Sequence, residues 1–463
     1  MAAGLGTRMR SRVPKVLHPL GGRPMLAYVL DAAREATGRD PIVVYSPATE
    51  ALTETFAGSA RFARQSEPRG TGDAVAAGLT EVDRDAGEIL VVNGDVPLLT
   101  AALLRDLLEA RRLDEAVMSL VAVDAIDPAG LGRVLRTAAG SVDRIVEEKD
   151  ADDDERDVST INAGIYAFDA GWLRDRIAAL RPSAATGELY LTDLVALARS
   201  EGRLVTALDV EDDGRLTGIN DRSQLAQAEW DLRTERNLAL MRAGVTMLDP
   251  STAYVDAGVE LATDVVLEPN VILRGATRIG EGTTIGAGSR IEDSTIGRDC
   301  RISASVVERS EVGDGVTVGP FAHLRAGSVV ADGAEIGNYA EIKASRIGRR
   351  VKQHHMSYLG DAEVGEETNV GAGTITANYD GTTKHRTTIG RHVFLGVHTM
   401  LRAPLTVGDD AKTGAGAVVT HDVAAGELVV GVPARPRRPR EADASAGAAA
   451  EPRKEDGAAD QAP

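Results

Sequence analysis

The sequence has 463 residues and a formal net charge of −18, with 52 lysines and arginines against 70 aspartates and glutamates. This length is expected to give two or three domains, and the acidity argues against a main role in binding nucleic acid or an anionic membrane. The single cysteine, Cys300, excludes an internal disulfide framework and is typical of a reducing compartment. No apolar run approaches the roughly 20 residues of a membrane span, so we expect a cytoplasmic protein.

The first half of the chain alternates apolar, strand-like runs with helical patterns. Residues 42–45 and 89–92 are expected to be buried strands, and residues 25–36 and 101–112 are expected to be amphipathic helices. This alternation predicts a parallel α/β sheet with helices on both faces. In such a sheet the ligand crevice lies at the carboxyl ends of the strands.

A glycine-rich segment opens the chain and runs Gly4-Leu-Gly-Thr-Arg-Met-Arg-Ser-Arg-Val-Pro-Lys15. Backbone N–H groups of such a turn can approach phosphate oxygens, and Arg8 and Lys15 add positive charge. Asp95 follows the strand 89–92. A carboxylate there, beside a phosphate loop, is a natural Mg²⁺ ligand. The alternative for a lone aspartate at that place is a simple turn residue.

The second half repeats about every six residues, with an aliphatic residue usually followed by glycine, as at Ile279, Ile285, Ile296 and Val312. This period predicts a parallel β-helix with three hexads in each triangular coil, rather than a disordered glycine-rich linker. The preceding residues 220–241 are charged and contain neither Gly nor Pro, so we expect a long helix that links two domains.

Two segments depart from the six-residue repeat. Between Ile375 and Ile389 the pattern lapses, which predicts an excursion loop, and such loops often carry function. After Pro433 the chain becomes rich in Arg and Pro and then in Ala, Glu and Asp. With almost no large apolar residues, the tail over residues 436–463 is expected to be disordered.

His355 is the candidate base of the second half because of its setting, His354-His355-Met-Ser-Tyr358. Imidazole can take a proton from a sugar ammonium near neutral pH. Arg325 and Lys343 suit a phosphate group. Since residues one or two coils apart can stack on one edge of a β-helix, these side chains could converge at one site.

Several strings resemble those of known enzymes. The segment from Gly4 to Lys15 resembles the signature of sugar-1-phosphate nucleotidyltransferases. Other matching segments resemble those that read uracil, bind the sugar and give the second metal ligand: 65–72, 130–134, 145–149, 161–165, 188–193 and 218–220. Together with the residues around His355, these segments extend the resemblance over roughly residues 1–435. Over that range the chain resembles the family of bacterial bifunctional N-acetylglucosamine-1-phosphate uridylyltransferases/glucosamine-1-phosphate N-acetyltransferases.

The resemblance implies the architecture and the chemistry. A Rossmann-like α/β nucleotidyltransferase domain (1–222), a helical linker (223–243) and a left-handed parallel β-helix (244–435) would precede the tail (436–463). Acetyl-CoA would acetylate glucosamine-1-phosphate, and UTP with Mg²⁺ would then give UDP-N-acetylglucosamine, used for peptidoglycan, the cell wall and cell shape. The family's β-helix is a homotrimer with the acetyl sites between subunits.

The resemblance also implies roles for individual residues. Lys15 and Arg8 would offset developing charge, Asp95 and Asn220 would hold Mg²⁺, and His355 would be the proton acceptor. UTP and UDP-N-acetylglucosamine would be bound by Ala2, Ala3, Gly4, Lys15, Gln65, Gly70, Thr71, Asn93, Gly94, Asp95, Gly132, Glu147, Asn162 and Asn220. Glucosamine-1-phosphate would be held by Arg325, Lys343, Tyr358, Asn369 and Lys384. Acetyl-CoA would be bound by Ala372, Asn378, Tyr379, Val397 and Ala415.

The sequence departs from the family pattern in places. Asp73 stands where the family usually has His, Val397-His398 replaces Ser and an acidic or amide residue, and Gly431 replaces an Arg. The family has a central β-strand just before the phosphate loop, so we expect roughly ten residues ahead of Met1.

Arginines at 435, 437 and 438 follow the last hexads. They could bind the phosphates of CoA, or they could form a basic segment exposed to solvent, and the sequence favours neither alternative.

Two other hypotheses remain at this point. The chain could be a single-activity sugar-1-phosphate nucleotidyltransferase whose β-helix serves assembly or regulation; Lys343, His355 and Tyr358 argue against this. It could also be a non-catalytic scaffold with the same two-part layout; Lys15 and Asp95 argue against that.

Overall fold

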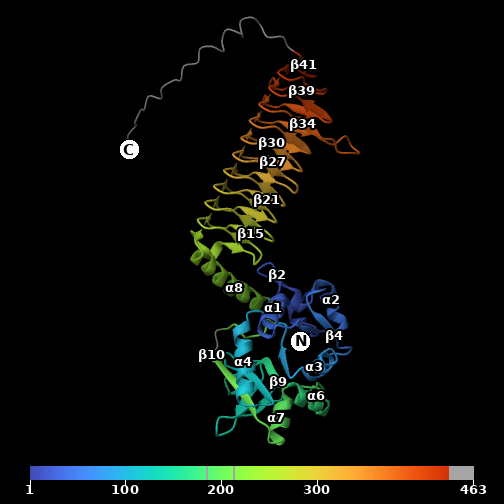
Figure 1. Cartoon of the computed structure of the whole chain (residues 1–463), viewed down its shortest axis with the longest axis vertical. Coiled ribbons are helices and arrows are strands. Elements are labelled where there is room, and N and C mark those ends of the chain that lie inside the picture. The colour runs from blue at the N-terminus through green and yellow to red at the C-terminus, as the bar shows by residue number, and fades with distance from the viewer. Residues whose placement is uncertain (184–185, 212–213, 437–463) are drawn as a thin grey trace, which may run out of the picture. The chain divides into compact units, whose positions relative to one another are not determined.

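The computed structural model describes residues 1–183, 186–211 and 214–436. The predicted disordered tail lies outside the described residues except for Pro436, and so do Arg437 and Arg438. The chain divides into two compact units, Met1–Glu235 and Arg236–Pro463. The division falls inside one long helix, α8 (Arg222–Arg242), which overlaps the residues predicted to link two domains (Figure 1).

The first unit is an α/β domain. Its remaining α-helices are α1 (Met25–Thr37), α2 (Ala51–Thr55), α3 (Thr71–Leu79), α4 (Ala101–Leu113), α5 (Asp153–Arg156), α6 (Ala170–Arg176) and α7 (Asp193–Ser200). Its strands are β1 (Pro19–Leu20), β2 (Arg23–Pro24), β3 (Ile42–Tyr45), β4 (Arg61–Arg64), β5 (Glu88–Val92), β6 (Met118–Asp124), β7 (Arg133–Arg136), β8 (Val142–Val146), β9 (Thr160–Asp169) and β10 (Val205–Glu211). The predicted strands and helices are therefore confirmed to within one residue at each end.

The main sheet of this unit has helices on both faces, as predicted. Side chains alternate along β6: Val121 packs into a core shared with α1 and α4, whereas Leu120 packs on the other face with α6 and α7. The prediction of a parallel sheet is wrong for this main sheet. Strand β9 runs antiparallel to β5, β6 and β7, and among the described residues of this unit the only parallel pairs are β3–β4 and β10–β6.

A cavity of about 740 Å³ lies between β3 and β5. These two strands belong to different sheets and are not hydrogen bonded to each other. Apolar side chains from α1, α3 and both strands line part of the cavity, and polar groups such as Asp40 and Arg61 line the rest. Backbone bonds close one end of it: the N–H of Ala2 donates to the carbonyl of Val44, and the amine of Met1 donates to the carbonyl of Val92.

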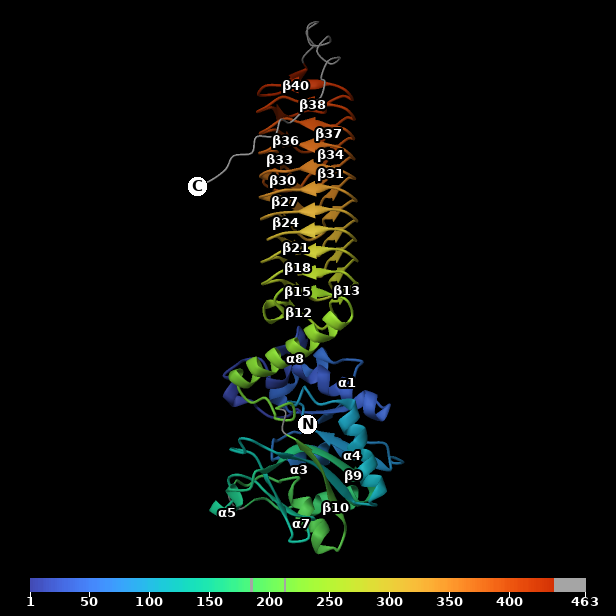
Figure 2. The same ribbon diagram turned by 90° about the vertical axis from the view of Figure 1, so that its left-hand side faces the viewer.

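The second unit is a parallel β-helix of three stacked sheets (Figure 2), which confirms the predicted fold class. Each sheet is named here after its first strand.

The β11 sheet contains, in order, β11 (Thr246–Met247), β14 (Val266–Leu267), β17 (Thr284–Ile285), β20 (Arg301–Ile302), β23 (Thr317–Val318), β26 (Glu335–Ile336), β29 (Lys352–Gln353), β32 (Asn369–Val370), β35 (Phe394–Leu395), β38 (Lys412–Thr413), β40 (Leu428–Val430) and the antiparallel β41 (Arg435–Pro436). The β12 sheet contains β12 (Tyr254–Val255), β15 (Ile272–Arg274), β18 (Arg290–Glu292), β21 (Val306–Glu308), β24 (His323–Leu324), β27 (Ala340–Lys343), β30 (Ser357–Gly360), β33 (Ile375–Ala377), β36 (Met400–Arg402) and β39 (Val418–Val419). The β13 sheet contains β13 (Glu260–Leu261), β16 (Arg278–Ile279), β19 (Thr295–Ile296), β22 (Glu311–Val312), β25 (Val329–Val330), β28 (Arg346–Ile347), β31 (Ala362–Val364), β34 (Thr387–Ile389) and β37 (Leu405–Val407).

The hexad residues form the core of this unit. Ile285, Ile302 and Val318 follow one another through the β11 sheet in register, and all three are almost completely buried. A narrow coil with three inward faces accommodates aliphatic side chains of this size, which explains why aromatic residues make up only 3% of the chain. The single thiol, Cys300, belongs to this core, and burial raises its pKa.

The predicted excursion loop is confirmed. It connects β33 to β34 and closes on itself through an antiparallel bridge between Tyr379 and Lys384. No helix within the described residues is long and apolar enough to cross a membrane.

Candidate functional sites

Three polar side chains meet at the carboxyl end of β5 in the first unit. The Nζ of Lys15 lies 2.5 Å from Oδ2 of Asp95 and 3.0 Å from Oδ1 of Asn220. Lys15 follows Pro14 at the start of a short 3-10 helix, Asp95 comes just after β5, and Asn220 precedes α8. The structure thus brings together residues separated by 80 and 205 positions, all three of which were predicted to act on phosphate or metal.

Neighbouring backbone groups hold the two metal-ligand candidates in place. The carbonyl of Asp95 accepts a hydrogen bond from the N–H of Ile219, and the Nδ2 of Asn220 donates to the carbonyl of Gly218. A Cβ at Gly218 would lie 3.3 Å from the Asp95 carboxylate, so the glycine lets the two loops approach closely. The sequence did not single out Gly218 for this packing role.

The residues at this point fit a magnesium ion. The Oδ1 atom of Asp95 is buried and has no hydrogen-bond partner among the described residues, and a cationic group already lies against its Oδ2 atom. Carboxylate and amide oxygens are the ligands that Mg²⁺ prefers. No cluster of three or more His, Cys, Asp or Glu within the described residues could hold a metal by itself, so substrate phosphates and water would have to complete the coordination shell.

The glycine-rich segment packs against Lys15. Gly6 has φ +57°, and a Cβ there would lie 2.6 Å from the Cβ of Lys15, so only glycine fits without displacing the lysine. Ala2 and Ala3 are buried, whereas Gly4 and Arg8 are exposed beside them. An exposed, glycine-rich turn next to a lysine is suited to phosphate contacts.

Asp73 holds the segment 65–72, which was predicted to bind the uracil base. The Nε2 of Gln65 donates to Oδ2 of Asp73 (2.8 Å) and to the carbonyl of Gly70 (3.2 Å), while Arg69 pairs with Oδ1 of Asp73. Thr71 begins α3 and accepts a hydrogen bond from the N–H of Leu191. Asp73, at the position where the resemblance led us to expect histidine, therefore orients Gln65.

The predicted sugar-binding residues gather around three strands: Gly132 directly precedes β7, Glu147 directly follows β8, and Asn162 lies on β9. The N–H of Asn162 donates to the carbonyl of Gly132, and a Cβ at Gly132 would lie 3.4 Å from the Glu147 carboxylate. Burial raises the pKa of Glu147, and Asp193 raises it further. Asn93 packs against Gly164, two residues beyond Asn162. Gly94 donates its N–H to the carbonyl of Met1.

A cationic cluster lies on the second unit where the β12-sheet strands end. Lys343 is the last residue of β27, and Arg325 directly follows β24, the preceding strand of the same sheet. Lys384, from the excursion loop, lies beside Lys343 and lowers its pKa. Tyr358 on β30 stands in register with Glu341 of β27. The concentrated positive charge suits a sugar phosphate.

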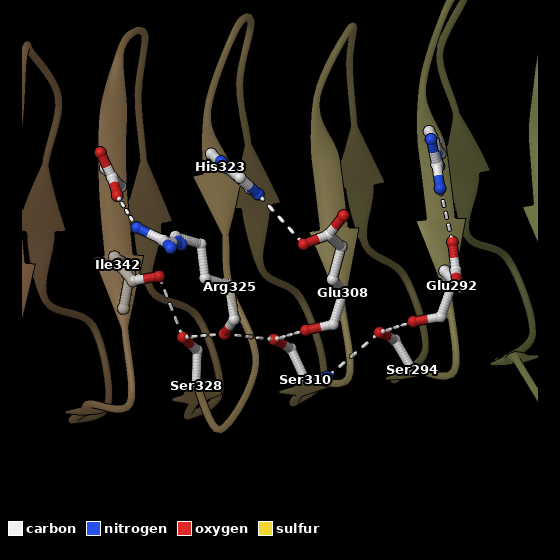
Figure 3. A network of polar contacts seen from close by, with 10 residues as sticks. Glu292, Ser294, Glu308, Ser310, His323, Arg325, Ser328 and Ile342 are labelled. Atoms are coloured by element: carbon white, nitrogen blue, oxygen red, sulfur yellow. Dashed lines mark hydrogen bonds and ion pairs between the residues drawn. The ribbon is translucent and has the colours of Figure 1, made fainter.

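Arg325 is held by partners that the sequence did not identify (Figure 3). Its guanidinium Nη1 donates to Glu341 (2.8 Å). Its carbonyl accepts from the buried hydroxyls of Ser310 (3.1 Å) and Ser328 (2.6 Å). These serines recur at one place in successive coils, and that spacing is the signal that could have revealed them.

A second group of residues predicted for acetyl transfer lies in the turns that connect each strand of the β11 sheet to the next strand of the β12 sheet. His355 occupies this corner between β29 and β30. Ala372, Val397 and Ala415 occupy the same corner in the following coils. All four are at least partly exposed, and they form one column along the β-helix.

The single chain does not bring all the predicted acetyltransferase residues together. The column that contains His355 and the cluster that contains Arg325 and Lys343 flank opposite ends of the β12-sheet strands. Asn369 lies on β32, in the β11 sheet. Asn378 begins the excursion loop and donates to Asp361 (2.5 Å).

Models of known protein families match the sequence of each unit separately, and they agree with the α/β fold of the first and the β-helix of the second. Residues 1–157 match the MobA-like NTP transferase domain. Residues 309–344 match the bacterial transferase hexapeptide repeat, and residues 276–307 and 386–421 match the hexapeptide repeat of succinyl-transferase.

Curated relatives match almost the whole chain. The chain is 46% identical over 433 residues to the bifunctional protein GlmU of Pelobacter propionicus, covering 93% of this chain and 94% of the relative. It is 45% identical to the protein of that name from Heliobacterium modesticaldum, with the same coverage. It is 41% identical to that from Mycobacterium bovis, covering 93% of this chain and 88% of the relative.

Proposed function

This chain belongs to the bifunctional GlmU family, and from that premise we propose that it makes UDP-N-acetylglucosamine in two steps, acetylation of glucosamine-1-phosphate followed by uridylyl transfer from UTP. The observation that carries the proposal is the convergence of Lys15, Asp95 and Asn220 beside the glycine-rich turn. The cationic cluster of the β-helix provides the second site.

In uridylyl transfer, a phosphate oxygen of N-acetylglucosamine-1-phosphate attacks the α-phosphorus of UTP, and pyrophosphate leaves. Asp95 and Asn220 would hold Mg²⁺, which supplies positive charge to the phosphates when bound. Lys15 and Arg8 offset the negative charge that develops. Gln65, oriented by Asp73, would contact the base. Because no covalent protein intermediate is needed, positioning and electrostatics account for the rate.

In acetyl transfer, His355 takes a proton from the ammonium of glucosamine-1-phosphate. The free amine then attacks the thioester carbonyl of acetyl-CoA and the C–S bond breaks. The departing thiolate takes the proton that the attacking nitrogen loses, so that CoA leaves as the thiol. Arg325, Lys343 and Lys384 would hold the sugar phosphate, with Tyr358 and Asn369. Ala372, Asn378, Tyr379, Val397 and Ala415 would line the acetyl-CoA groove.

We further propose that the active form is a cytoplasmic homotrimer. Support comes from the separation of His355 from the cluster at Arg325 and Lys343 within one subunit. A neighbouring copy of the β-helix could bring the column of one subunit to the cluster of the next. Sedimentation analysis of the full chain tests this, and a monomer that acetylates glucosamine-1-phosphate at full rate would contradict it.

Two variants test the assignment of the two reactions. Asp95→Asn should reduce pyrophosphate release at least about 100-fold, because a charged ligand and its electrostatic contribution are lost. His355→Ala should reduce CoA release by about 10²- to 10⁴-fold, as expected for loss of a general base.

Each variant is the control for the other, since each should leave the opposite reaction within about twofold of the unmodified chain. If Asp95→Asn released pyrophosphate at the normal rate, the nucleotidyl site would be wrong. If the acetyl reaction were absent from the unmodified chain, the single-activity hypothesis would replace this one.

A further inference from the structure

The ammonium of Lys15 occupies the place where the two proposed metal ligands point. Its Nζ atom lies between Oδ2 of Asp95 and Oδ1 of Asn220, at 2.5 and 3.0 Å. The side chains of Lys15 and Asp95 are only 14% and 19% exposed. The three side chains therefore form a shielded set rather than a loose surface pair.

The orientation of Asn220 shows that this set is arranged to hold a cation. Its Nδ2 donates to the carbonyl of Gly218 (2.9 Å), which can only accept a hydrogen bond, so the amide oxygen must face Lys15. The N–H of Asn220 donates to Oε1 of Gln224, which fixes the start of α8. A carboxylate oxygen and an amide oxygen are thus held toward one point.

Lys15 and a metal ion cannot use these two oxygens at the same time. Magnesium binds oxygen at about 2.0–2.1 Å, so an ion shared by Asp95 and Asn220 would overlap the position of Nζ. The two positive charges would also repel each other strongly in a shielded site. One cation must leave before the other binds.

We propose that Lys15 is a placeholder cation: in the nucleotide-free enzyme its ammonium binds Asp95 and Asn220, and the arriving divalent metal displaces it. The displaced ammonium is then free to bind a phosphate of the nucleotide that arrives with the metal. The inference rests on the proposed uridylyl transfer, and it adds that Lys15 opposes metal binding when no nucleotide is present.

The test measures metal binding without turnover. Mn²⁺ is titrated into the full-length, nucleotide-free protein, and free Mn²⁺ is followed by electron paramagnetic resonance. Lys15→Met, which removes the competing charge and keeps a similar chain length, should bind Mn²⁺ at least about tenfold more tightly than the unmodified protein. Arg12→Met removes an exposed cation three residues before Lys15 that has no assigned role, and it should leave the affinity unchanged.

Equal or weaker binding by Lys15→Met would overturn the proposal, because the metal would then use only the buried Oδ1 of Asp95 while Lys15 stays in place. Thermal unfolding of the variant, compared with that of the unmodified protein, reports whether its first unit, Met1–Glu235, is folded.

A second measurement uses the unmodified protein. Modification of lysines by acetic anhydride, read by mass spectrometry, should rise severalfold at Lys15 when Mn²⁺ is added, and stay constant at the exposed Lys352. An unchanged Lys15 signal would contradict displacement. Pyrophosphate release is assayed separately, so a failure of the proposed function is distinguishable from a failure of this inference.

Discussion

The two units build their sites in different ways. In the first, Lys15, Asp95 and Asn220 come from loops far apart in the sequence and meet only because the α/β unit folds. In the second, His355, Ala372 and Val397 occupy one corner of successive coils, so the β-helix register alone sets their spacing. The first site therefore depends on individual close contacts, whereas the second depends on a repeated backbone.

The largest effect should come from breaking the repeated core. Ile342 is completely buried beneath the cationic cluster, and Ile342→Ala should cost about 3 kcal/mol of unfolding free energy through lost burial and the cavity left behind. Denaturant unfolding followed by loss of the acetyl reaction measures this cost. Leu248→Ala, on a side chain of the same unit that is 64% exposed, is the control and should change stability by less than about 0.5 kcal/mol. A similar small change for Ile342→Ala would mean that the coils are loosely packed.

A smaller and more local effect is expected from the close contact at Gly6. Gly6→Ala should reduce pyrophosphate release about 100-fold, equivalent to about 2.7 kcal/mol, because the new Cβ would collide with Lys15. Acetyl transfer should be unaffected.

The matched control for Gly6→Ala is Gly288→Ala in the β-helix. Gly288 also has positive φ, +72°, but a Cβ added there would meet no atom within 4 Å. The substitution should cost only about 1 kcal/mol of backbone strain and leave both rates unchanged. Equal losses of pyrophosphate release in both variants would show that contact with Lys15 is not the cause.

The half-buried carboxylate of Glu147 should give a smaller, pH-dependent effect on the free energy of unfolding. Because burial raises its pKa, the folded state holds the proton more tightly than the unfolded state. The stability this confers is present at low pH and is lost as the pH rises through the raised pKa. Glu147→Gln should therefore stabilise the protein at pH 7 and make no difference near pH 3. Thermal unfolding across this range measures it, and stabilisation confined to low pH would contradict the sign.

The smallest effect is expected at the ion pairs on the outside of the β-helix. Arg350 pairs with Glu367 one coil away, and this contact lowers the pKa of the Glu367 carboxyl. Both side chains are well exposed, so water and salt screen the pair. Arg350→Gln should leave the melting temperature unchanged at both low and high salt. A clear drop would mean that the exposed pairs, and not only the aliphatic core, hold the coils in register.

The sequence predicted most of the repetitive structure of the chain. The Ile and Val spacing indicated the β-helix and its loop before β34, and the position of Asp95 after a strand indicated its place at the sheet edge. The antiparallel course of β9 was missed because an apolar strand has the same residue pattern in either direction. The contact of Lys15 with both Asp95 and Asn220 was also missed, since it depends on how two distant loops pack around Gly218.

The burial of Cys300 has a practical consequence. The only thiol of the chain is 2% exposed and lies within hydrogen-bond distance of the carbonyl of Gly313, and its raised pKa keeps the reactive thiolate scarce. Thiol-directed reagents should therefore leave the native enzyme unlabelled. A cysteine introduced at the exposed Tyr379 would carry a fluorophore or spin label at that position alone, and would report the motion of the excursion loop directly.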